Sequence, residues 1–364
     1  MEDRKIRVAI THGDTNGIGY ELIFKTFAEP EMLELCTPII YGSPKIAAYH
    51  RKAMEMQANF SIINSADEAQ DGRVNLLTCF DDEVKVELGQ PTKESGEAAL
   101  KALDRAMTDF RSHQYDALVA CPVCHATKTA EGYTYNSLQQ YSETSVGDGA
   151  KAVKLLINES LRIASATADT ALKDVPAALT QDAINDKIKA LSLCLKRDFR
   201  ISNPRIAVLA LNAEAGYEEA ATIAPAIKQA EESGINAYGP FAAEEFFAQG
   251  MHNAFDCTLA MYDDQAAIPF ATLMQNDGVC YIAALPIVCT APALTPAFDT
   301  AGRGTADESA LRHAIYTAID VARNRCQYDT PLANPLPKLY HEKRDESEKV
   351  RFAIPKKHDF KKQQ

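Results

Sequence analysis

Short apolar segments rich in β-branched residues alternate along the chain with longer segments in which apolar residues recur every three or four positions. Many of the short segments are apolar throughout, as expected for strands that are covered on both faces. This alternation predicts an α/β protein built from doubly wound, mainly parallel sheets. The expected strands are residues 7–11, 38–41, 74–79, 116–123, 162–167, 205–211, 257–262 and 279–284.

Helical periodicity fills the intervals between these strands. One helix is expected to begin at Ser43 and Pro44, with the serine as N-cap and the proline in the first position. Gly234 is expected to end another helix. From Tyr328 onward the chain becomes rich in proline and then in charge, and its composition is compatible with a packed arm or with disorder. The other expected helices are residues 96–111, 150–160, 180–196, 217–232 and 307–324.

Length and charge restrict the class of protein. A chain of 364 residues predicts two domains. The net charge of −12 argues against a general nucleic-acid binder, which needs a basic surface for phosphates. No secretory leader and no apolar run of membrane-spanning length is evident, so we expect a cytoplasmic protein without a membrane partner. The nine cysteines are odd in number and scattered, which favours reduced thiols over a disulfide framework.

Two local motifs allow both a structural and a functional interpretation. Cys121 and Cys124 form a single CxxC, which is weak support for a redox or zinc site and is more typical of structural thiols. The glycine-rich segment from Gly13 to Gly19 joins a strand to a helix, but its spacing matches neither a Walker A loop nor a dinucleotide fingerprint. Spacing alone therefore leaves open a tight turn or an anion-binding loop. His12 and His125 stand near strand ends, where either role is open.

Six motifs follow one another in a fixed order between residues 5 and 325. They are Gly13-Asp14-x-x-Gly17-Ile18-Gly19-x-Glu21, residues 38–42, residues 172–176, Leu211-Asn212-x-x-Ala215-Gly216, Leu259-Ala260-Met261-Tyr262-x-Asp264-Gln265 and Ala297-Phe298-Asp299-x-Ala301-Gly302-x-Gly304. In this order they resemble the motifs of the 4-hydroxythreonine-4-phosphate dehydrogenases, enzymes of pyridoxal phosphate synthesis. The chain is identified as a divergent member of that family.

The resemblance implies a fold similar to isocitrate and isopropylmalate dehydrogenases, with two doubly wound α/β domains and a central cleft. One domain would comprise residues 1–120 and 300–327, the other residues 121–299, and residues 328–364 would form a charged tail. The resemblance also implies a homodimer that binds a small-molecule substrate. In such enzymes NAD or NADP removes hydride from a hydroxy acid, the keto acid then loses CO₂, and a divalent cation polarises the oxygen.

The resemblance places carboxylates where the family has three metal-binding histidines. These positions fall on Asp169, Glu214 and Asp263. Three carboxylates would suit Mg²⁺ or Mn²⁺ better than Zn²⁺. The alternative is that they do not converge, or that they pair with nearby lysines. Asp264, followed by Gln265, matches a retained motif and is the expected catalytic acid.

The resemblance also places altered residues at the substrate positions and retained residues at the cofactor positions. Asn136 and Ser137 fall where the family binds substrate, and the cofactor signature falls on Asp299, Gly302 and Gly304. Expected cations and an amide are replaced at Ala271, Cys280 and Cys289, so we expect poor binding of the family's phosphorylated substrate and a small-molecule substrate other than it. We expect an NAD(P)-dependent dehydrogenase with altered ligands. The alternatives are an inactive or repurposed homologue that acts as a small-molecule-binding or regulatory dimer, or another reaction on this scaffold with the carboxylates holding Mg²⁺.

Overall fold

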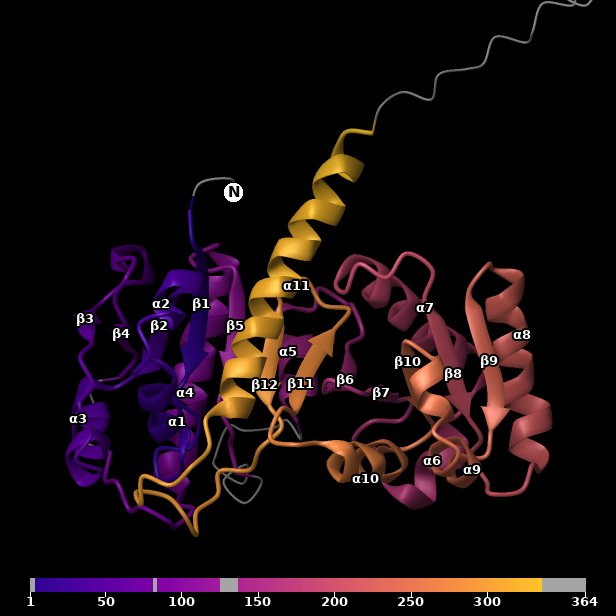
Figure 1. Ribbon diagram of the computed structural model, residues 1–364, viewed down its shortest axis with the longest axis horizontal. Coiled ribbons are helices and arrows are strands. Elements are labelled where there is room, and N and C mark those ends of the chain that lie inside the picture. The colour runs from indigo at the N-terminus through magenta and orange to yellow at the C-terminus, as the bar shows by residue number, and fades with distance from the viewer. Residues whose placement is uncertain (1–3, 81–83, 125–136, 336–364) are drawn as a thin grey trace, which may run out of the picture.

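A single sheet of 12 strands runs through the whole molecule in the computed structural model, with helices packed against it (Figure 1). The structure describes residues 4–80, 84–124 and 137–335. The strand order is β3-β4-β2-β1-β5-β12-β11-β6-β7-β10-β8-β9. The predicted α/β class is therefore confirmed.

The sheet consists of two parallel halves joined by antiparallel strands. β3, β4, β2, β1, β5 and β12 are mutually parallel, and β7, β10, β8 and β9 form a second parallel set. Between them, β11 runs antiparallel to both β12 and β6, and β6 runs antiparallel to β7. The strands are β1 (Ile6–Thr11), β2 (Cys36–Gly42), β3 (Ser61–Ile63), β4 (Asn75–Thr78), β5 (Ala117–Ala120), β6 (Val153–Ile157), β7 (Arg162–Ser165), β8 (Arg205–Leu209), β9 (Asn236–Phe241), β10 (Cys257–Ala260), β11 (Val279–Ala283) and β12 (Cys289–Pro292).

Most helices connect consecutive strands, as a doubly wound fold requires. Gly234 has a positive φ of 78° after α8, which confirms the predicted helix end. Among the described helices, none has the length and apolar character that crossing a membrane requires. The helices are α1 (Gly19–Thr26), α2 (Met32–Leu35), α3 (Pro44–Ala53), α4 (Lys93–Arg111), α5 (Leu138–Val146), α6 (Val175–Ala178), α7 (Gln181–Arg197), α8 (Ala224–Glu232), α9 (Ala243–Ala248), α10 (Asp263–Leu273) and α11 (Ser309–Ala333), with short turns η1 (Ala66–Glu68), η3 (Leu172–Asp174), η4 (Glu219–Ile223) and η5 (Met251–Ala254).

One predicted helix is wrong, and the error matters for the site. Residues 150–160 form strand β6 and its flanks rather than a helix. The side chains of β6 alternate in burial: Val153, Leu155 and Ile157 are buried, whereas Lys154 and Leu156 are partly exposed on the other face. This period of two places the side chain of Lys154 on a defined face of the sheet.

The long helix α11 crosses the middle of the molecule and packs against β12, β5 and β11 (Figure 1). It continues to Ala333, past the point where the sequence suggested a separate tail. Arg325 fixes this helix by donating from Nε to Asp198 Oδ1 at 2.8 Å and from a terminal nitrogen to the Tyr281 hydroxyl at 2.7 Å. Because Asp198 caps α7 and Tyr281 lies on β11, this buried network joins three elements.

Candidate functional site

Two of the three predicted carboxylates lie side by side where parallel strands end. Asp169 follows β7, and Asp263 begins α10 directly after β10. β7 and β10 are paired in parallel, with Ser165 opposite Ala260, so their carboxyl ends lie next to each other. The backbone N–H of Asp169 donates to Oδ2 of Asp263 at 2.8 Å. Asp169 has a left-handed φ of 60°, which Asp adopts more readily than most residues.

Lys154 brings a positive charge to this pair. Its Nζ lies 3.2 Å from Oδ1 of Asp263, and its side chain is 25% exposed. Burial alone would lower the pKa of Lys154, but the Asp263 carboxylate and neighbouring groups outweigh it and raise the pKa, so the ammonium stays protonated. Cys280, on the adjacent strand β11, also faces this cluster, and desolvation raises the pKa of its thiol to about 11. Sequence reasoning missed Lys154 because it assigned its segment to a helix.

The third predicted carboxylate is not part of this group. Glu214 is exposed on the loop between β8 and η4. In the part of the chain that the structure describes, no three His, Cys, Asp or Glu side chains are arranged to hold a metal ion. Both oxygens of Asp263 already accept a protein donor. The Lys154 ammonium already lies against Oδ1 of Asp263 and supplies the positive charge that pairs this carboxylate. These residues therefore do not fit the divalent cation that the resemblance implies.

The loop that carries Glu214 is organised by a different carboxylate. Glu219 is buried, and it accepts the backbone N–H of Asn212 at 2.9 Å and of Gly216 at 2.7 Å. Burial would raise the pKa of Glu219, but these N–H donors outweigh it and lower the pKa. The loop thus has a fixed shape, and Glu219 is a second residue that the motif comparison did not reveal.

Asp264 lies beside a hollow of about 380 Å³. The hollow is bounded by the β8 end, by α9 and by α10, including Asn212, Phe247 and Tyr262. Asp264 is exposed there, so its carboxylate is accessible to a ligand. The adjacent Gln265 has a structural role: it accepts the Met261 N–H at 2.7 Å and donates to the Ala210 carbonyl at 2.8 Å, which ties the ends of β10 and β8 together.

The predicted substrate positions carry no positive charge where the structure describes them. Asn136 lies outside the described residues, as does His125. The Ser137 hydroxyl caps α5 by accepting the Gln140 N–H at 3.2 Å. Cys289 is fully buried, and burial raises the pKa of its thiol to about 12. Neither this thiol nor that of Cys280 can balance the charge of a phosphate.

The glycine loop is used for packing. The Ile18 N–H at the start of α1 donates to the Pro296 carbonyl at 3.1 Å, and the Asp14 N–H donates to the Pro122 carbonyl at 3.0 Å. A Cβ on Gly19 would lie 1.9 Å from the His12 carbonyl oxygen. Backbone donors at two positions of the loop are thus already used, which favours the interpretation as a tight turn.

Two groups next to this loop, His12 and Cys121, are buried and neutral at pH 7. His12 stacks on Tyr20 with ring centroids 5.3 Å apart, and burial lowers the pKa of His12 to about 4. Burial raises the pKa of Cys121, the first cysteine of the CxxC, to about 12, which makes it unreactive at neutral pH. All nine cysteines are free in the structure.

The predicted cofactor signature forms an exposed loop before α11. Asp299 and Gly304 are exposed, and Gly302 and Gly304 have positive φ values of 77° and 69°. A Cβ on Gly302 would lie 2.6 Å from Leu88, whereas the space beside Gly304 is open. The backbone at Gly304 can therefore be approached by a ligand, which is compatible with a dinucleotide contact.

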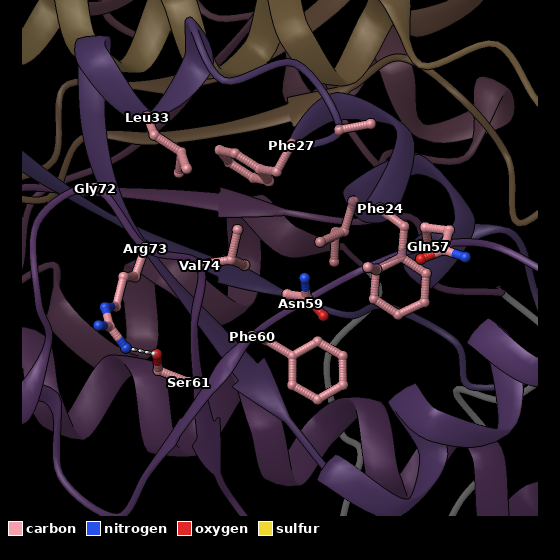
Figure 2. Close-up of a pocket in the computed structure, with 13 residues that line it drawn as sticks. Phe24, Phe27, Leu33, Gln57, Asn59, Phe60, Ser61, Gly72, Arg73 and Val74 are labelled. Atoms are coloured by element: carbon pink, nitrogen blue, oxygen red, sulfur yellow. Dashed lines mark hydrogen bonds between the residues drawn. The ribbon is translucent and has the colours of Figure 1, made fainter.

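A separate aromatic cavity of about 510 Å³ lies between α1 and the β3–β4 edge of the sheet (Figure 2). Phe24, Phe27 and Phe60 project into it, and Arg73 lies at its margin near Ser61. None of its lining residues is Asp, Glu, His or Cys, so it lacks the acid–base groups of a dehydrogenase site.

The fold is that of a known group of dehydrogenases. A crystal structure of a 4-hydroxythreonine-4-phosphate dehydrogenase from Klebsiella pneumoniae superposes with a TM-score of 0.74, covering 88% of this chain and 99% of that chain at 24% identity. The family model described as "Pyridoxal phosphate biosynthetic protein PdxA" matches residues 34–318. The chain therefore belongs to the PdxA family.

Relatives in sequence agree with this assignment. A 4-hydroxythreonine-4-phosphate dehydrogenase of Bacteroides thetaiotaomicron is 48% identical over 358 residues, covering 97% of this chain and 98% of the relative. One of Geobacter metallireducens is 33% identical over 338 residues, covering 89% and 97%. The resemblance drawn from the six motifs is confirmed, and so is the expectation of a dehydrogenase-family enzyme.

Proposed function

We propose that the chain is an NAD(P)-dependent dehydrogenase that oxidises a small hydroxy acid and then decarboxylates it, with 4-hydroxythreonine 4-phosphate as the first substrate to test. The observation that supports this most is the meeting of Lys154, Asp169 and Asp263 at the paired ends of β7 and β10, with the exposed Asp264 following Asp263 in the first turn of α10. An ammonium and an exposed carboxylate at the same edge of the sheet are the kinds of group that removal of a proton from an alcohol requires.

The overall reaction assigns a distinct task to each group. A bound nicotinamide cofactor would supply the acceptor for the hydride of the alcohol carbon. We assign Asp264 as the acceptor of the alcohol proton, because its carboxylate is exposed and borders the hollow. The bond to the carboxylate carbon then breaks, CO₂ leaves, and the electron pair remains on the substrate until a proton replaces it. Asp299 and the backbone at Gly302 and Gly304 are the proposed contacts of the cofactor.

The loss of positive charge at the substrate positions favours a second candidate function, namely a homologue that binds a small molecule without turnover. Cys289 is fully buried, and Ala271 is an exposed alanine on α10, so neither can bind a phosphate as Lys or Arg would. Under this second candidate function, the chain would act as a binding or regulatory dimer. A homodimer belongs to both proposals and is checked by light scattering on the purified protein.

Turnover separates the two candidates. Purified protein is mixed with 4-hydroxythreonine 4-phosphate and NAD⁺ or NADP⁺, and the nicotinamide absorbance and released CO₂ are followed. Asp264→Asn should abolish most turnover while leaving the midpoint of thermal unfolding unchanged. Absence of turnover with both cofactors, with and without added Mg²⁺, Mn²⁺ or Zn²⁺, would contradict the dehydrogenase and favour the binding protein.

A further inference from the structure

The cluster of Lys154, Asp169, Asp263 and Cys280 has a protein ammonium where the family resemblance implies a metal ion. We propose that the Lys154 ammonium is the resident cation of this site and contacts the reacting oxygen of the substrate directly, so that the reaction needs no divalent cation. This inference rests on the proposed dehydrogenase function, because it assigns a role within that reaction.

The donors around Asp263 leave little place for a metal ion. Oδ1 faces the Lys154 ammonium at 3.2 Å, and Oδ2 accepts the Asp169 N–H at 2.8 Å. Cys280 faces the cluster from β11, but a single thiol beside two carboxylates does not make the oxygen-rich set that Mg²⁺ or Mn²⁺ prefers. Glu214, the third expected ligand, stands on an exposed loop outside the cluster. The site therefore resembles a lysine held by a carboxylate more than an incomplete metal site.

The position of Lys154 suits contact with a ligand. Lys154 lies on β6, and this strand is held rigidly because it pairs with β11 on one side and with β7 on the other. An ammonium has three donors, and Asp263 occupies one of them in the structure. With 25% of its side chain exposed, Lys154 can offer another donor to a bound oxygen.

The chemistry requires a positive charge that persists through both steps. When the alcohol loses its proton and its hydride, the ammonium donates a hydrogen bond to the oxygen as negative charge develops on it. When CO₂ leaves, the electron pair of the broken bond is delocalised onto the same oxygen, and the same hydrogen bond stabilises it. Lys154 keeps its proton throughout, so Asp264 remains the group that accepts the alcohol proton.

The decisive variants change the charge at position 154 with little change in shape. Lys154→Met retains the length of the side chain and removes the charge, while Lys154→Arg retains the charge. Lys151→Met is the matched control, because Lys151 is 85% exposed just before β6 and belongs to no part of the cluster. Each protein is assayed after exhaustive chelation, with and without added Mg²⁺, Mn²⁺ or Zn²⁺.

We expect wild-type and Lys151→Met turnover to survive chelation unchanged. Lys154→Met should lower kcat by about 10²–10³, the loss typical of a donor to a developing oxyanion, with a smaller effect on KM. Lys154→Arg should retain more activity than Lys154→Met, and ethylammonium should partly restore Lys154→Ala. A merely structural lysine would instead lower the unfolding temperature without amine rescue or a selective effect on kcat.

Metal binding provides a measurement that does not depend on turnover. Mn²⁺ is titrated into wild-type protein and into Asp263→Asn by calorimetry, and we expect the same weak binding in both. A stoichiometric Mn²⁺ site that is present in the wild type and lost in Asp263→Asn would overturn the inference, as would turnover that chelation abolishes and Mn²⁺ restores. Absence of turnover under every condition would contradict the proposed function, and the Mn²⁺ titration would still decide whether the site holds a metal ion.

Discussion

Removing one partner of the buried ion pair between Arg325 and Asp198 should strongly lower the free energy of unfolding. The two side chains are 7% and 2% exposed. Arg325 also donates to the carbonyl of Leu285 at 2.9 Å and to that of Pro286 at 3.0 Å. Arg325→Met would leave the Asp198 carboxylate buried with its main charge partner removed, together with several carbonyls that lose a charged donor.

The expected cost follows from the burial of the remaining charge. Removing one partner of a buried ion pair costs about 3–5 kcal/mol, whereas an exposed pair contributes about 0–1 kcal/mol. Arg325→Met should therefore lower the free energy of unfolding by about 3–5 kcal/mol. Lys85→Met, in a pair whose side chains are 76% and 35% exposed, is the surface control and should cost far less than Arg325→Met.

Urea unfolding followed by far-ultraviolet circular dichroism is the suitable measurement, because the chain has no tryptophan. The double variant Arg325→Met with Asp198→Asn should lose less stability than the sum of the single losses, since the second change removes the unpaired charge. An Arg325→Met protein within about 1 kcal/mol of wild type would show that water or rearranged donors compensate Asp198, and would refute this reasoning.

Three further changes test the local structure. Gly19→Ala should lower the unfolding temperature markedly, because its Cβ would lie 1.9 Å from the His12 carbonyl oxygen; a normal melting temperature would contradict the described packing. Thr92→Ala removes the capping box of α4 and should cost about 1 kcal/mol in urea unfolding. Glu219→Gln should destabilise the protein at neutral pH. The pKa of Glu219 in the folded protein lies below its ordinary value of 4.5. The ionised carboxylate therefore stabilises the folded protein above pH 4.5, and this stabilisation is lost as the pH falls through the folded pKa. A difference in urea midpoint between wild type and Glu219→Gln that grows on acidification would contradict this.

Much of the fold could be predicted because buried parallel strands have a strong local signal. The segments around β1, β8 and β10 are continuous apolar runs, and each is present as a strand. In addition to β6, the strands β3, β9 and β12 were not predicted. β3 has three residues, and β9 contains Gly239 and Pro240, which weaken any strand pattern. Such strands are stabilised by pairing with distant segments, which local sequence does not report.

The candidate site was only partly predictable for a related reason. Motif order correctly selected Asp169 and Asp263 as neighbours, because parallel pairing of β7 and β10 brings their ends together. It also grouped Glu214 with them, although that residue belongs to a loop whose shape Glu219 determines. The position of a loop residue depends on such contacts more than on the motif around it.

The incorrect helix at residues 150–160 and the missed cation have a single cause. In a helix, Lys154 would share a face with residues 150 and 157–158, whereas in β6 it projects from one face of the sheet, opposite Ile282 of β11. Only the strand places its ammonium at Asp263. Asp263, which replaces one of the expected histidines, therefore has its partner on a strand that lies far away in sequence. Three acidic replacements by themselves suggest a site for Mg²⁺. The structure brings only Asp169 and Asp263 together and pairs Asp263 with Lys154, and for this reason we propose that the positive charge of the site belongs to the protein.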